Sequence, residues 1–146
     1  MSKNKTILLV EDNRNDELLA MRALKKNPSI SEVTVVRDGA EAINYIFNEK
    51  KDNYNKKLPE LILLDLNLPK LNGLEVLRKI KEDKITCQIP VVIMTSSGEE
   101  SDINSSYKLG ANSYLRKPVD FSEFSTLISN LTAYWLTLNR SPNKTH

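Results

Sequence analysis

The chain has 146 residues, of which 40% are hydrophobic and 27% are charged, as is typical of one globular domain. Its 21 basic and 19 acidic side chains leave a net charge of +2, too balanced to favour nucleic acid or a membrane surface as a partner. A single cysteine excludes an intramolecular disulfide, and a single histidine at the last position excludes histidine-based triads and zinc sites.

Five short runs rich in leucine or β-branched residues are the predicted strands. In chain order they cover residues 6–10, 33–36, 61–65, 91–95 and 113–117. Three of the runs are apolar on both sides of the strand alternation, as expected for parallel strands that are covered on both faces. The fifth run is more polar, which suits a strand at the edge of a sheet.

Helical periodicity and start signals fill the segments between the predicted strands. Asp38, Asn72 and Asp120 are each followed three residues later by a glutamate, the pattern of a helix cap. The first helix is expected to end at Asn27-Pro28 and the fourth at Gly110. Six apolar side chains are expected to share one face of the last helix: Phe124, Leu127, Ile128, Leu131, Trp135 and Leu138.

A strand followed by a helix, five times over, predicts an α/β domain with a parallel sheet and right-handed crossovers. The domain is expected to cover residues 5–138, and residues 139–146 are expected to form a disordered tail. The polar stretch 48–59 is predicted to be a long loop.

Polar side chains stand where four of the predicted strands end, the edge at which doubly wound sheets build their sites. They are Glu11 and Asp12 after the first strand, Asp65 in the third, Thr95 and Ser96 around the end of the fourth, and Lys117 in the fifth. Taken singly, such residues are often only caps or solvated side chains, and Asp12 or Asn13 would serve to cap the first helix. Asp65 is not explained in this way, because Asn72 is the expected cap of the helix that follows it. A shared site is therefore favoured.

Carboxylates held close together repel one another unless a cation lies among them. Mg²⁺ prefers carboxylate and carbonyl oxygens, and a carboxylate held beside the metal can attack a phosphoryl group. Lys117 would help to neutralise the charge on the phosphoryl oxygens, and the Thr95 hydroxyl would donate to one of them. The spacing thus predicts Mg²⁺-dependent phosphoryl transfer onto Asp65.

The segments LLVEDN, LILLDLNLPKLNG, PVVIMTSS and SYLRKP resemble the signatures of response-regulator receiver domains, the CheY-like family, over residues 5–138. This resemblance implies a flavodoxin-like (βα)5 fold, doubly wound, with five parallel strands in the order 2-1-3-4-5. Among receiver domains, the segment LLDLNLPK, the 48–59 loop and the segment AYWL near the end are most similar to those of the small receiver-only regulators associated with bacterial phytochrome histidine kinases.

The resemblance also implies roles for individual residues. Asp65 matches the phosphoacceptor. The implied Mg²⁺ ligands are Glu11 (through water), Asp12, Asp65 and the backbone carbonyl of Asn67. The implied phosphoryl-binding and switch residues are Thr95, Ser96, Tyr114 and Lys117. Pro118 matches the proline of the family's cis Lys-Pro peptide bond.

These roles imply a switch. Without a phosphoryl group Thr95 is expected to be free and Tyr114 mobile; with one, Thr95 moves inward and Tyr114 rotates into the vacated space. The change would remodel the face of the fourth helix, fifth strand and fifth helix. The implied partners are a histidine kinase, such as a phytochrome, and a second copy of the chain on that face, with no nucleic acid and no membrane. The chain is expected to be cytoplasmic and to catalyse only its own phosphorylation and dephosphorylation.

Three alternative functions have less support from the sequence. A phosphatase with an aspartyl nucleophile would carry D-x-D at its first strand, whereas the residue two after Asp65 is Asn67. A nucleotide-binding module lacks support, because the four glycines form neither G-x-G-x-x-G nor a P-loop. A receiver that is never phosphorylated is disfavoured by the complete acceptor set. For Tyr107, Tyr114, Trp135 and Leu138, docking a partner and covering the sheet both remain open.

Overall fold

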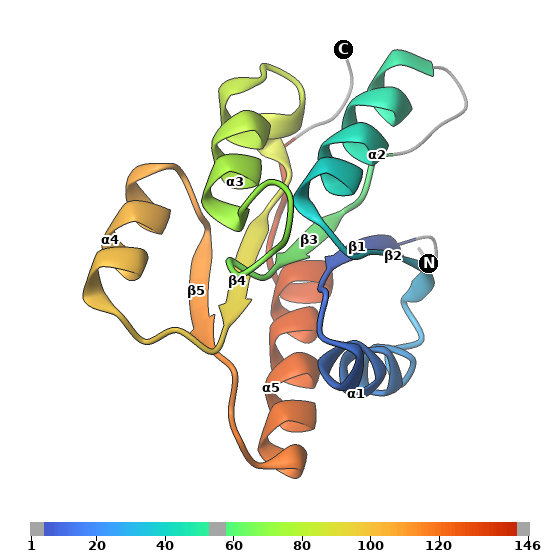
Figure 1. Ribbon diagram of the computed structural model, residues 1–146. Coiled ribbons are helices and arrows are strands. Elements are labelled where there is room, and N and C mark those ends of the chain that lie inside the picture. The colour runs from blue at the N-terminus through green and yellow to red at the C-terminus, as the bar shows by residue number, and fades with distance from the viewer. Residues whose placement is uncertain (1–4, 53–57, 143–146) are drawn as a thin grey trace.

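The computed structural model describes residues 5–52 and 58–142 and contains a five-stranded parallel sheet in the order β2-β1-β3-β4-β5 (Figure 1). This is the strand order of the flavodoxin-like fold, as expected. The strands are β1 (Lys5–Val10), β2 (Ile30–Val36), β3 (Leu61–Leu64), β4 (Val91–Thr95) and β5 (Ser113–Arg116). The first strand of the chain lies inside the sheet, with β2 on one side of it and β3 on the other.

Helices connect the strands. They are α1 (Arg14–Leu24), α2 (Gly39–Asp52), α3 (Gly73–Glu82), α4 (Glu100–Lys108) and α5 (Phe121–Ala133), with a 3₁₀ turn η2 (Thr86–Gln88) and a π turn η3 (Tyr134–Leu138). The three predicted caps are confirmed, since the side chains of Asp38, Asn72 and Asp120 each accept a bond from the backbone N–H three residues on. Asn13, not Asp12, caps α1 in the same way.

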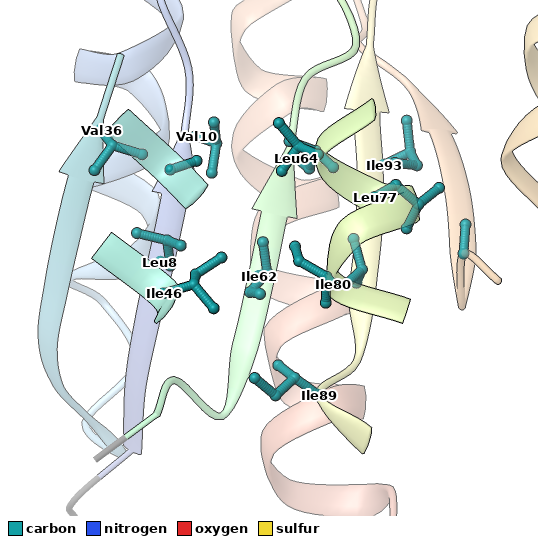
Figure 2. Close-up of a cluster of buried hydrophobic side chains, with 14 of the residues drawn as sticks. Leu8, Val10, Val36, Ile46, Ile62, Leu64, Leu77, Ile80, Ile89 and Ile93 are labelled. Atoms are coloured by element: carbon teal, nitrogen blue, oxygen red, sulfur yellow. The ribbon is translucent and has the colours of Figure 1, made fainter. Parts of the chain in front are cut away.

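The hydrophobic core has two layers, one on each face of the sheet. Leu8, Val10, Ile62 and Leu64 point toward α2 and α3, where they meet side chains such as Ile46, Leu77 and Ile80 (Figure 2). The alternate side chains of the same strands point the other way and pack against α1 and α5. Both faces of the central strands are thus buried, as their uninterrupted apolar runs predicted.

Two predicted boundaries move and one is confirmed. The helix α2 continues to Asp52, so the predicted 48–59 loop begins later than expected, and part of it lies outside the described residues. The helix α1 ends at Leu24, before Asn27-Pro28, because the Asn27 N–H bonds the Leu24 carbonyl in a turn that already leaves the helix. Gly110 directly follows the cap of α4 and has φ of 107°, a conformation that glycine adopts without strain.

The last helix differs from its predicted face at its C-terminal end. The Asn139 N–H bonds the Tyr134 carbonyl five residues back, and such a π turn is wider than an α turn. The wider turn rotates the later side chains, so Leu136 is buried and Leu138 is 69% exposed. The prediction that Leu138 shares the buried face is therefore wrong. Part of the predicted 139–146 tail lies outside the described residues, and its disorder stays a prediction.

The edge strand β5 is flanked by α4. Figure 1 shows α4 apart from α2 and α3 on one face of the sheet and from α1 and α5 on the other. Of the nine residues of α4, Ser106 alone is buried, so this helix adds little to the core. In the part of the chain that the structure describes, no helix has the length and apolar character needed to cross a membrane.

Candidate functional site

Three carboxylates meet at the carboxyl edge of the sheet. Strands β1 and β3 pair in parallel with Val10 beside Leu64, so the residues that follow them are neighbours. Ligand oxygens of Glu11, Asp12 and Asp65 lie within 4.8 Å of one another. Glu11 and Asp65 are buried, whereas Asp12 is exposed, so the cluster reaches solvent at Asp12.

Backbone N–H groups hold the two buried carboxylates in place. The Asn13 N–H donates to Glu11 Oε2 at 3.0 Å, and the Asn67 N–H donates to Asp65 Oδ1 at 3.1 Å. Each carboxylate thus has one oxygen fixed by the loop that follows its strand. This arrangement orients the acids before any ligand arrives, which lowers the cost of assembling a charged site.

The ammonium of Lys117 lies among the carboxylates, as predicted. Lys117 Nζ is 2.9 Å from Glu11 Oε1 and 2.8 Å from Asp65 Oδ2, and the lysine side chain is only 8% exposed. A third carboxylate contact was not predicted: Asp16 Oδ2 lies 2.7 Å from the same nitrogen. Its sequence signal was weak, because an acid in the first turn of a helix usually does no more than complement the helix dipole.

The protonation of the site follows from this crowding. Burial raises the pKa of Glu11 from 4.5 to about 7; the hydrogen bond from Lys117 opposes this rise, and the charge of Asp65 adds to it. Burial also disfavours the ammonium of Lys117, but its bonds to Asp16, Asp65 and Glu11 outweigh that cost and raise the pKa of the lysine. Lys117 therefore stays charged, while Glu11 would gain from a second cation beside it.

The turn after Asp65 is tightly packed. A Cβ on Gly73 would lie 2.4 Å from the Asp65 carbonyl oxygen, and a Cβ on Gly39 would lie 1.7 Å from that of Leu71. Neither position therefore has room for any side chain. Lys70, within the turn, has φ of 70°, which is uncommon outside glycine and marks a backbone constrained by its surroundings.

The predicted switch residues lie beside the site. Thr95 is fully buried at the end of β4, whereas Ser96 is exposed. The Tyr114 hydroxyl donates to the Ser97 carbonyl at 2.9 Å, and burial raises the pKa of this tyrosine. The ring is half-buried and makes this bond, and the mobility expected of it stays a prediction.

The predicted cis bond before Pro118 is wrong for this structure. All peptide bonds of the described residues are trans, including that between Lys117 and Pro118. The trans form is favoured by about 0.5–1 kcal/mol for a bond that precedes proline. Lys117 already reaches its three carboxylates from the trans backbone, so these contacts do not require the cis form.

Comparison with known proteins identifies the family of this chain. The model of the response regulator receiver domain matches residues 7–129, most of the chain. The chain belongs to the response regulator receiver family. This receiver domain is 39% identical over 136 residues to the "Probable methanogenesis regulatory protein FilR2" of Methanothrix harundinacea, covering 93% of this chain and 86% of that protein. It is also 39% identical over 132 residues to the "Response regulator Rcp1" of Synechocystis, covering 90% and 89%.

Solved structures show the same relationship. The receiver domain superposes on the phosphorylated cyanobacterial phytochrome response regulator RcpA with a TM-score of 0.89 and 41% identity, covering 96% of this chain and 99% of that one. Its TM-score with the Mn²⁺-bound form of Rcp1 is 0.85, at 37% identity, with 96% and 100% covered. The fold and the kinship to phytochrome response regulators are therefore shown, and the chain is a receiver-domain response regulator of two-component signalling.

Proposed function

We propose that this receiver domain accepts a phosphoryl group on Asp65 from a histidine kinase, with Mg²⁺, and signals by a change in its contacts with other proteins. The observation that carries the proposal is the position of Asp65. Its carboxylate is buried, has one oxygen bonded by Lys117 and the other by the Asn67 N–H, and lies beside two further acids.

The donor set fits a divalent cation. Three carboxylates with ligand oxygens within 4.8 Å of one another offer the hard oxygen ligands that Mg²⁺ prefers. The negative charge of Asp65 raises the pKa of Glu11, and a cation between them would relieve this repulsion. We assign the ligands as Glu11 (through water), Asp12, Asp65 and the backbone carbonyl of Asn67. Bound there, Mg²⁺ would neutralise charge on the transferring phosphoryl oxygens. The Mn²⁺-bound form of the related Rcp1 supports a divalent metal.

The chain's own residues then have defined tasks. A carboxylate oxygen of Asp65 attacks phosphorus, the bond from phosphorus to the kinase imidazole nitrogen breaks, and the imidazole leaves with that electron pair. Lys117 donates to a phosphoryl oxygen, and the Thr95 hydroxyl donates to another. Hydrolysis by water later returns Asp65 and inorganic phosphate, so the chain catalyses only its own phosphorylation and dephosphorylation.

The signal would leave through the face of α4, β5 and α5. Tyr114 on β5 pairs with Ile93 of β4, and its hydroxyl bonds the Ser97 carbonyl two residues after Thr95. A Thr95 hydroxyl drawn toward the phosphoryl group would therefore shift the loop to which that ring is bonded. The kinship to Rcp1 and RcpA supports a phytochrome as the kinase, acting in the cytoplasm.

We also propose that this face pairs with a second copy of the chain. Tyr107 on α4 is 51% exposed, a large side chain available for such a contact. More dimer in the presence of beryllofluoride is expected in sedimentation. A mass that never changes would remove the dimer but leave phosphorylation untouched.

The decisive experiment is Asp65→Asn with acetyl phosphate and Mg²⁺. We expect the wild type to gain one phosphoryl group by intact-protein mass spectrometry and the variant to gain none. Asp120→Asn is the matched control, because it makes the same chemical change at a helix cap where asparagine also functions. Labelling of Asp65→Asn at the wild-type rate would refute the assignment.

The same assay separates the alternatives. A phosphatase would hydrolyse an external phosphate monoester with repeated turnover, whereas a receiver should leave the monoester intact and release only phosphate accepted from an activated donor such as acetyl phosphate. A receiver that is never phosphorylated would show no mass change in the wild type. Loss of labelling in excess chelator is expected from the metal requirement, and unchanged labelling there would contradict it.

A further inference from the structure

The bonding of Lys117 contains a contact that the phosphoryl-transfer site does not need. An ammonium has three N–H donors, and in this structure each has a carboxylate within bonding distance. Glu11 and Asp65 belong to the acid cluster at the strand ends. Asp16 comes instead from the first turn of α1, and it is not part of that cluster.

This difference matters when the site is loaded. A metal and a phosphoryl group would engage Glu11 and Asp65, which are then less available to the lysine. Asp16 has no such second task, so its bond to Lys117 can persist through the reaction. Since a lysine side chain has four flexible carbons and loses rotamer entropy when it is fixed, one lasting anchor has a large effect on where its charge lies.

Contacts at the start of α1 orient the Asp16 side chain toward Lys117. The Asp16 N–H donates to the Asn13 cap at 2.9 Å, which fixes the first turn of α1. The next residue, Glu17, is buried and binds the Arg37 guanidinium through both oxygens, at 3.0 and 2.7 Å. These bonds tie the start of α1 to the end of β2 and leave the Asp16 carboxylate directed toward Lys117.

We propose that Asp16 is a positioning residue, which holds the Lys117 ammonium at the place where it meets the incoming phosphoryl oxygens. The proposal rests on the proposed function of Asp65. It does not make Asp16 a metal ligand, and it predicts that metal affinity and phosphorylation rate respond differently to its loss.

The first test measures both quantities in Asp16→Ala and Asp16→Asn. We expect the rate of phosphorylation by acetyl phosphate to fall about tenfold in Asp16→Ala, because a misplaced catalytic charge stabilises the transition state less, and to fall less in Asp16→Asn, which keeps an acceptor. Mg²⁺ affinity, titrated without donor, should change less than about twofold. Asp16→Glu should restore part of the rate.

Glu123→Ala is the matched control. Glu123 is an exposed acid in the first turn of α5, so its removal deletes the same charge from an equivalent helix position away from Lys117. We expect its rate to equal that of the wild type. If Asp16→Ala and Asp16→Asn are both as fast as Glu123→Ala, the proposal is wrong.

A second test needs neither metal nor phosphoryl donor. In ¹⁵N NMR of the metal-free protein, the ammonium signal of Lys117 should be protected from exchange in the wild type and broadened or lost in Asp16→Ala. An unchanged signal would overturn the proposal even if the rate fell, since the loss of rate would then have another origin.

A third test separates this inference from the proposed function. In a Lys117→Met background, Asp16→Ala should slow phosphorylation less than about twofold, because an effect that passes through the lysine disappears with it. A full tenfold effect there would overturn the inference. If instead the wild type takes no label, the proposed function fails, while the NMR signal still reports on the anchor.

Discussion

Two lysines withdrawn from solvent lie at opposite edges of the sheet, and each donates to three acceptors. Lys117 binds carboxylates of Glu11, Asp16 and Asp65 at the carboxyl ends of the strands. At the other edge, Lys81 Nζ donates to the carbonyls of Cys87 and Ile89 and to the Asn112 side chain, at 3.0, 2.8 and 3.1 Å.

The acceptors give the two ammonium groups opposite properties. Burial lowers the pKa of Lys81, and its neutral acceptors do not compensate for that loss of hydration. The carboxylates do compensate at Lys117 and raise its pKa. Lys81, which donates only to neutral oxygens, therefore serves as a structural cross-link between α3 and the segments that precede β4 and β5. The carboxylates around Lys117 instead keep its ammonium charged, as binding of an anionic ligand requires.

The largest expected effect comes from Lys117→Met. Phosphorylation of Asp65 should slow by a factor of about 100, because the variant loses a charge that stabilises the transition state. The metal-free protein should also lose about 3 kcal/mol of unfolding free energy at neutral pH, because the buried acids remain without their cation. Urea unfolding and acetyl phosphate labelling measure the two effects.

The pH dependence of that loss has a definite sign. Folding raises the pKa of Glu11 to about 7, and removing the opposing bond from Lys117 raises it further. An acid whose pKa is raised by folding destabilises the protein as the pH rises above its unfolded value. The stability lost in Lys117→Met should therefore be larger at pH 8 than at pH 6, and the reverse order would contradict this account.

The next effect comes from Mg²⁺. A cation that binds only the folded protein should add about 2.7 kcal/mol of unfolding free energy at one hundred times its Kd. Asp12→Ala should lose most of this gain, whereas Lys81→Met should keep all of it, since Lys81 lies at the other edge. Thermal unfolding with and without Mg²⁺ checks both variants, and an equal gain in Asp12→Ala would remove Asp12 from the ligand set.

The smallest effect is expected from Lys81→Met itself. Its acceptors would be left without their donor, at a cost of about 1–3 kcal/mol, and the relief of burying a charge offsets part of that cost. We expect a net loss of about 1 kcal/mol with an unchanged rate of phosphorylation. A slowed rate would break the comparison, because Lys81 would then influence the site from the far edge of the sheet.

The residues alone predicted the class of the sheet and the centre of the site, whereas the strand order followed from the resemblance to receiver domains. Parallel strands place their carboxyl ends at a shared edge, so Glu11, Asp12, Asp65 and Lys117 could be brought together without knowing any helix position. The apolar runs of the same strands, buried on both faces, fixed the class of the sheet.

Features that depend on the tilt of a helix against the sheet, or on the type of its last turn, were not predictable in this way. The contact of Asp16 with Lys117 joins residues 101 positions apart and requires the tilt of α1, which no local pattern encodes. Leu138 was misplaced because a π turn cannot be told from an α turn by hydrophobic spacing. The bond before Pro118 was inferred from kinship, and kinship does not fix a conformation whose alternatives differ by about 1 kcal/mol.

The two crowded glycines have a consequence for how this chain tolerates mutation. Neither Gly39 nor Gly73 belongs to the proposed phosphoryl-transfer site, yet at both positions an added Cβ would overlap backbone atoms. In a saturation library selected for signalling, both positions should be as strictly depleted as Asp65. Depletion at Asp65 would reflect loss of the proposed phosphoacceptor in a protein that still folds. Depletion at the glycines would instead reflect a loop after Asp65 that can no longer pack against the starts of α2 and α3.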